Sequence, residues 1–182
     1  MDNNKIISLL QQPSSFKEGY NLLVESYTSV LYWYIRRMLV VHEDTQDVLQ
    51  NVWVKVYLNL PGIKGNAESL KAWLYKIATN ESINWLKKKR ASKWDSIDDV
   101  NEQLLSSFSE QISCSEEEME AKFQKAIIAL PHKQKVVFNM RYYDELPYQQ
   151  ISEITGQSVN TLKTNYHYAV ETIKTKLDIK NE

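Results

Sequence analysis

Apolar residues recur at a helical spacing over most of the chain. Over residues 16–38 they fall three or four positions apart, which predicts a long amphipathic helix. A second helix is predicted over residues 44–60, with Asp44 as its N-cap and Tyr57 in its apolar stripe, and a third over about residues 70–90. Three helices of this length can bury a common core. We therefore expect a first helical domain at residues 1–93.

The helical pattern fades and then returns. Residues 94–115 are rich in Ser, Asp and Glu, a composition that buries too little apolar surface to order itself, so we interpret them as an acidic flexible linker. From residue 116 the pattern predicts four short helices, which end near residues 130, 143, 155 and 177. The expected fold class is therefore all-α, with two small helical domains joined by a linker and the second domain at 116–182.

The last two predicted helices form a helix-turn-helix. Gly156 stands where the chain must leave one helix in a left-handed conformation, and Ser158 can cap the next helix. Apolar residues from Val159 to Leu177 recur on one side of that helix. The opposite side presents short polar and cationic side chains, which suit the major groove of DNA. These candidate DNA-binding residues are Asn160, Thr161, Lys163, Thr164, His167 and Tyr168.

The net charge of −1 hides an uneven distribution. Residues 1–94 carry 13 Lys/Arg against 8 Asp/Glu, and residues 122–182 carry 9 against 6. Residues 95–121 carry 9 acidic residues and no basic ones. Two basic blocks separated by an acidic segment favour two polyanion-binding modules joined by a segment that repels polyanions.

Several function classes are disfavoured by composition. A single cysteine and the lack of a signal peptide or a long apolar run predict a cytoplasmic protein. The three histidines lie in different segments without metal-ligand spacing, and no Gly-rich phosphate loop is present. We therefore expect no enzyme activity, no metal and no cofactor.

The first domain carries two further polar surfaces. On the third predicted helix, amides and then cations suit a nucleic-acid strand; these candidates are Asn80, Asn84, Lys87, Lys88 and Arg90. On the second predicted helix, Asp47, Gln50 and Asn51 form a polar face beside the apolar stripe. By itself that face implies no partner.

The order of these features resembles one family. The run Asp47-Val-Leu-Gln50-Asn-Val-Trp53 resembles the acidic helix of bacterial RNA polymerase sigma factors, and residues 72–90 resemble their promoter-melting helix. Ala129-Leu130-Pro131 and the helix-turn-helix resemble their C-terminal promoter-binding domain. The chain is similar to a two-domain sigma factor of the extracytoplasmic-function (ECF) class.

The resemblance implies a role for each surface. Asp47, Gln50 and Asn51 would bind core RNA polymerase, and Lys64 and Asn66 would lie beside a base flipped from the minus-ten element. The amides and cations from Asn80 to Arg90 would hold the opened strand, and the helix-turn-helix would read the minus-thirty-five duplex. The resemblance further implies an anti-sigma factor, in this class often membrane-bound, and a monomer when free.

One other reading stays open from the residues alone. A stand-alone helix-turn-helix regulator, with an N-terminal domain that senses a ligand or dimerises, would bind a palindromic operator as a dimer without polymerase. A pure interaction protein that sequesters a partner is disfavoured by the basic surface after Asn80.

Overall fold

The computed structural model of the protein describes residues 3–60, 67–93 and 118–177. Throughout these ranges the regular structure is helical, without strands, as the sequence pattern predicts. The predicted linker and the loop that contains Lys64 and Asn66 lie outside the described residues. In the described part of the chain, no helix is both long and apolar enough to cross a membrane.

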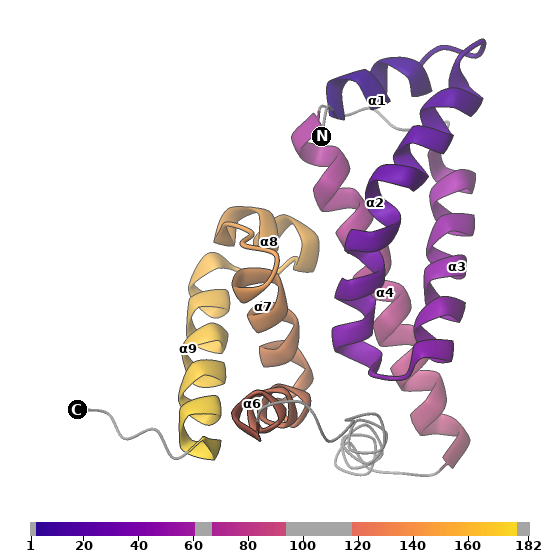
Figure 1. Ribbon diagram of the computed structural model, residues 1–182. Helices are drawn as coiled ribbons and strands as arrows, with labels where there is room; N and C mark the ends of the chain where they lie inside the picture. Colours follow the sequence, from indigo (N-terminus) through magenta and orange to yellow (C-terminus); the bar gives the residue numbers. More distant parts are fainter. Residues whose placement is uncertain (1–2, 61–66, 94–117, 178–182) are drawn as a thin grey trace.

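The N-terminal half is a bundle of three long helices with a short one across its end (Figure 1). Its elements are α1 (Asn3–Leu10), α2 (Phe16–Leu39), α3 (His42–Asn59) and α4 (Ala67–Lys93). The three long helices agree with the predicted ones to within a few residues at each end. Their inward faces supply a core that includes Leu31, Val52 and Leu74, each with no exposed surface. Burial of such side chains is the main source of stability in a small bundle.

Two buried tyrosines, which contact each other, place polar hydroxyl groups inside this core. The Tyr34 and Tyr75 rings meet edge to face at 5.0 Å between their centroids. The Tyr34 hydroxyl lies 2.8 Å from Thr79 Oγ1, so its polar end has a partner inside the bundle. Burial raises the pKa of both phenols above the usual range, so each remains protonated at neutral pH.

Helix α1 was not predicted. Three of its eight residues, Ile6, Ile7 and Leu10, are buried against the bundle. The C-terminal end of α1 approaches α2 at Gly19, where an added Cβ would come within 2.9 Å of the Leu10 nitrogen. The close packing of these two helices therefore depends on glycine at this position.

The C-terminal half contains α6 (Glu118–Ile128), α7 (His132–Tyr142), α8 (Tyr148–Thr155) and α9 (Val159–Lys176). Pro131 and Pro147 are the N-caps of α7 and α8, positions where the missing proline N–H is not needed. Phe138, Ala169 and Ile173 of α7 and α9 belong to a small core to which α6 contributes Ala126 and Ile127. The observed boundaries agree with the four predicted helices.

The two halves contact each other directly. Arg37 of α2 forms an ion pair with Asp144, at 2.8 Å between Nη2 and Oδ1, and its guanidinium lies 4.6 Å from the centre of the Tyr143 ring. Asn139 Nδ2 lies 3.6 Å from the Met38 sulfur. Apolar residues of α7, α8 and α9 also belong to the same buried cluster as the N-terminal core. The domain limits at residues 93 and 116 stay a prediction.

Two predictions for α3 are wrong. The helix begins at His42 with Val41 as its N-cap, so Asp44 lies in the first turn and does not cap the helix. Its carboxylate is instead paired with Lys89 of α4. Tyr57 was placed in the apolar stripe but is 52% exposed, because the α3 core face is occupied by Val52, Val56 and Leu60.

Candidate functional site

The turn between α8 and α9 has the geometry predicted for a helix-turn-helix. Gly156 ends α8 with φ at 71°, in the left-handed region that glycine adopts without cost. Ser158 then caps α9, because its hydroxyl accepts a hydrogen bond from the Thr161 N–H at 3.1 Å. Across the turn, Ser152 Oγ donates to the Gln157 carbonyl at 2.7 Å. These bonds hold α9 at a defined angle to α8.

Helix α9 presents a continuous polar face. Leu162, Ala169 and Ile173 are buried on the inner side, as predicted. Tyr166 is partly buried, and its ring stacks on that of Phe138 at 5.9 Å between centroids. All six predicted DNA-contacting side chains are exposed: Asn160, Thr161, Lys163, Thr164, His167 and Tyr168.

This face can read and hold a DNA duplex. Amide and hydroxyl groups offer donors and acceptors to base edges, and the Lys163 ammonium can meet a guanine or a phosphate. Hydrogen bonds at the start of α9 already orient two of the hydroxyl groups. Thr161 Oγ1 lies 2.8 Å from Ser158 Oγ, and Thr164 Oγ1 donates to the Asn160 carbonyl at 3.0 Å. The first turn of α9 also directs free N–H groups outward, and these favour a phosphate.

A second polar surface lies on α4. Asn80, Asn84 and Lys87 are exposed and follow one another at spacings of four and three residues, so they form one stripe along the helix. Arg90 lies further along α4, but its side chain is outside the described residues, as are Lys64 and Asn66. The structure therefore brings together the three central members of the predicted strand-binding set.

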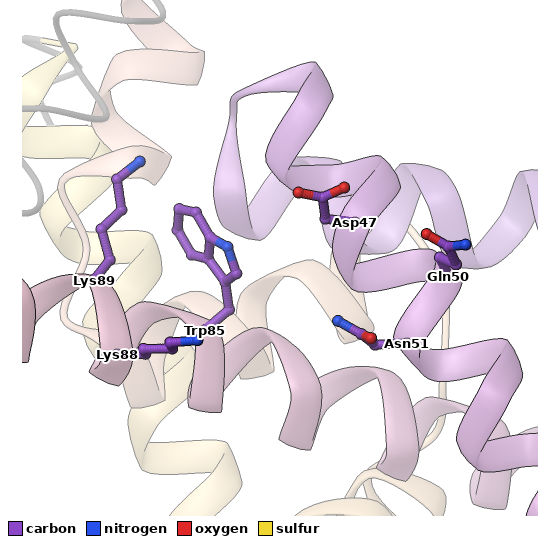
Figure 2. Close-up of a pocket in the computed structure, with 6 residues that line it drawn as sticks. All are labelled: Asp47, Gln50, Asn51, Trp85, Lys88 and Lys89. Carbon is purple, nitrogen blue, oxygen red and sulfur yellow. The ribbon is translucent and has the colours of Figure 1, made fainter.

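A pocket of about 550 Å³ lies between α3 and the C-terminal part of α4 (Figure 2). Asp47, Gln50 and Asn51, the three predicted polymerase-binding residues, form its α3 wall, and all are exposed. The α4 wall consists of Trp85, Lys88 and Lys89. Residues that the sequence assigned to two different surfaces therefore share one pocket.

Internal contacts fix the α4 wall of this pocket. Lys89 Nζ is 3.1 Å from an Asp44 carboxylate oxygen and 4.4 Å from the centre of the Trp85 ring. In Figure 2 the indole of Trp85 stands between Lys89 and Asp47. This role of Trp85 and Lys89 was not predicted from the sequence. Their position beside Asp44 depends on how α3 packs on α4, which the helical period of neither segment reveals.

Comparison with known proteins identifies related sequences over most of the chain. Residues 23–92 match the Sigma-70 region 2 family, and residues 120–173 match the Sigma-70 region 4 family. The ECF RNA polymerase sigma factor SigW of Bacillus subtilis is 28% identical over 169 residues, which cover 88% of this chain and 90% of that protein. The ECF RNA polymerase sigma-E factor of Escherichia coli K12 is 29% identical over 170 residues, with 88% and 87% covered.

Two solved structures have a similar fold. CnrH, determined in complex with the cytosolic domain of CnrY, superposes with a TM-score of 0.69 over 99% of this chain and all of that chain, at 16% identity. The sigma factor RpoE of Bartonella quintana, determined with the anti-sigma factor NepR, gives a TM-score of 0.67 over 89% of this chain and 98% of that chain, also at 16% identity.

Proposed function

The chain belongs to the sigma-70 family as an RNA polymerase sigma factor of the ECF class, and from this premise we propose how its surfaces direct promoter-specific transcription initiation. The exposed polar face of α9, the helix that Ser158 caps, is the observation that best supports the DNA-reading part of the proposal. On this proposal Lys163, Thr164 and His167 contact the minus-thirty-five element as duplex.

We propose that the N-terminal half binds the polymerase and the opened strand on separate faces. Asp47, Gln50 and Asn51 of α3 bind core RNA polymerase, which fits their exposure on one helix face. Asn80 and Asn84 of α4 contact the melted minus-ten strand, with cations for its phosphates further along the helix. Lys64 and Asn66 lie beside the captured base. The proposed division of labour places residues 1–93 at the minus-ten element and residues 116–182 at the minus-thirty-five element.

Promoter melting on this proposal requires binding energy and no catalysis by the protein itself. Unpairing a base and moving it into a pocket costs a few kcal/mol. Stacking and hydrogen bonds to the captured strand return on the order of 1–3 kcal/mol per base. The protein acts in the cytoplasm, where its polymerase and promoters are. The polymerase holds both halves at one promoter, so two modest contacts combine through a high effective concentration.

We also propose that an anti-sigma factor controls the protein. The structural neighbour RpoE was solved in complex with the anti-sigma factor NepR. A partner of this kind would act by covering surfaces that polymerase needs, such as the exposed face of α3 around Asp47.

Gel-shift titrations test the proposed dependence on polymerase. We expect the free chain to bind a promoter duplex at least about 100-fold more weakly than the same chain assembled with core RNA polymerase, because the scaffold supplies the effective concentration. A scrambled duplex of equal length is the control for non-specific binding. Comparable affinity without polymerase, with a dimer on a palindromic site, would instead indicate a self-sufficient regulator.

A further inference from the structure

The exposed surface of α4 divides into two stripes with different neighbours. Asn80, Asn84 and Lys87 form one stripe, whereas Glu81, Trp85 and Lys88 lie one position further along at each step. One residue rotates the helix by about 100°, so the stripes point in clearly different directions. Glu81 is paired with Lys55 of α3, so the second stripe faces α3.

The contacts of Lys89 extend this second stripe. Its ammonium lies between the Asp44 carboxylate of α3, at 3.1 Å, and the Trp85 ring, at 4.4 Å from the centroid. Its side chain is 29% exposed, so the charge is largely used within the protein. Lys89 therefore positions the indole of Trp85 in the wall of the pocket and is poorly placed to neutralise a phosphate.

The charges around the pocket do not suit a nucleic-acid backbone. Asp47 and Asp44 carry two negative charges, and Lys88 and Lys89 carry two positive charges, so these four side chains are neutral together. A strand-binding groove is positive along its length, since each phosphate is negative. The exposed carboxylate of Asp47 lines the same pocket as Lys88, so it would repel a phosphate bound there.

The same features suit a protein surface. The pocket combines an exposed carboxylate, two amides, an exposed ammonium and an aromatic ring within one depression of about 550 Å³. Tryptophan is enriched at the energetically important centres of protein interfaces, where neighbouring polar groups exclude water. The pocket is also continuous with the α3 face that we propose as the polymerase-binding surface.

We propose that Trp85 and Lys88 belong to the polymerase-docking surface and not to the promoter-strand surface. The occupant is a surface of the polymerase that presents a basic side chain to Asp47 and an acidic side chain to Lys88, with apolar atoms against Trp85. Lys88, which the sequence assigned to the promoter strand, is thereby separated in function from its neighbour Lys87. This inference rests on the proposed docking at Asp47.

Charge reversal of the two neighbouring lysines tests the inference. The affinity of the full chain for core RNA polymerase is measured without DNA for the wild type, Lys88→Glu and Lys87→Glu. Both side chains are exposed and the charge change is identical, so Lys87→Glu is a matched control. We expect Lys88→Glu to weaken polymerase binding about tenfold or more, because it faces the partner's acidic group with a like charge, and Lys87→Glu to stay within about twofold.

The converse measurement uses holoenzyme assembled at saturating polymerase on a forked minus-ten DNA. Here Lys87→Glu is expected to weaken capture of the fork more than Lys88→Glu does. Equal losses for the two variants in polymerase binding, or a loss for Lys88→Glu confined to the fork, would overturn the inference.

The affinity of Asp47→Lys for core RNA polymerase, measured in the same assay, distinguishes failure of this inference from failure of the proposed function. If Asp47→Lys weakens polymerase binding and Lys88→Glu does not, the assignment of Lys88 is wrong and the docking face stands. If Asp47→Lys has no effect either, the proposed docking on α3 is itself wrong. Circular dichroism of each variant checks that the helices are intact.

Discussion

Lys135 is a buried charged residue. It lies in the first turn of α7, is 4% exposed, and burial lowers the pKa of its ammonium to about 8. An unfolded chain would keep the ordinary value of 10.5. Below pH 8 both states are protonated and the native state carries the full cost of the buried charge. Between pH 8 and 10.5 the unfolded state binds more protons, so stability rises with pH.

We therefore expect Lys135→Met to stabilise the protein at pH 7 by roughly 1–3 kcal/mol. The gain should shrink as the pH rises from 8 towards 10.5, where the wild type has lost the charge. Urea unfolding of both proteins at pH 7 and pH 9.5 measures this, and other titrating groups cancel in the difference. A stability difference that is the same at both pH values would contradict this account of Lys135.

Errors at the residue scale came from tertiary contacts. Asp44 was expected to cap α3, yet its carboxylate contacts Lys89, which lies 45 residues later. Tyr57 matched the apolar period of α3, yet its ring lies on the outside and meets the edges of Phe16 and Tyr20, at 6.2 and 5.2 Å between centroids. An N-cap candidate can instead lie in the first turn of its helix, and an apolar residue at the border of a stripe can face the core or the solvent. Only the packing of the neighbouring helix decides between these positions.

At the scale of elements, the helix-turn-helix was the most predictable part of the chain. Gly156 and Ser158 act through their own backbone and hydroxyl, so local chemistry alone specifies the turn. By contrast, α1 has only eight residues, too few for a helical period to stand out, and its burial depends on the approach to Gly19. The division of α4 into two stripes was also missed, because it depends on which side packs against α3.

The turn offers a test at this scale. Gly156 has a positive φ, and a Cβ added there would have no atom within 4 Å, so the cost of a substitution is that of the backbone alone. We expect Gly156→Ala to lower the free energy of unfolding by about 1–2 kcal/mol. Gly156→Asn should cost less, because asparagine tolerates the left-handed region better. Thermal unfolding of both variants distinguishes this backbone effect from a steric one, under which the larger asparagine would cost more.

At the scale of the whole molecule, the sequence predicted two helical domains and left their relative placement open. In the structure, buried residues of both halves belong to one cluster. Arg37 and Asp144 are 107 residues apart and form a 2.8 Å ion pair between the halves. Burial raises the pKa of the Asp144 carboxyl, and the Arg37 guanidinium opposes that shift. Nothing in the period of either segment marks such a pair, because it is defined only when both halves are packed.

We propose that two DNA-facing surfaces, one around Asn80 and one around Lys163, bind the two elements of a single promoter. Both side chains are exposed, which the assignment requires. The charge blocks and the order of motifs indicated these surfaces from sequence. The pocket that Asp47, Gln50 and Asn51 share with Trp85, Lys88 and Lys89 became visible only when α3 and α4 were seen together.

Transcription in vitro tests the central claim most directly. Core RNA polymerase is combined with the full chain on fragmented genomic DNA from the source organism, and the 5′ ends of the transcripts are sequenced. We predict new start sites, absent with core polymerase alone, that share two separated upstream elements. Asn80→Ala and Lys163→Ala should each reduce initiation there about tenfold, the loss expected for one specific DNA contact. Transcripts that start at the same positions with and without the chain would contradict the account.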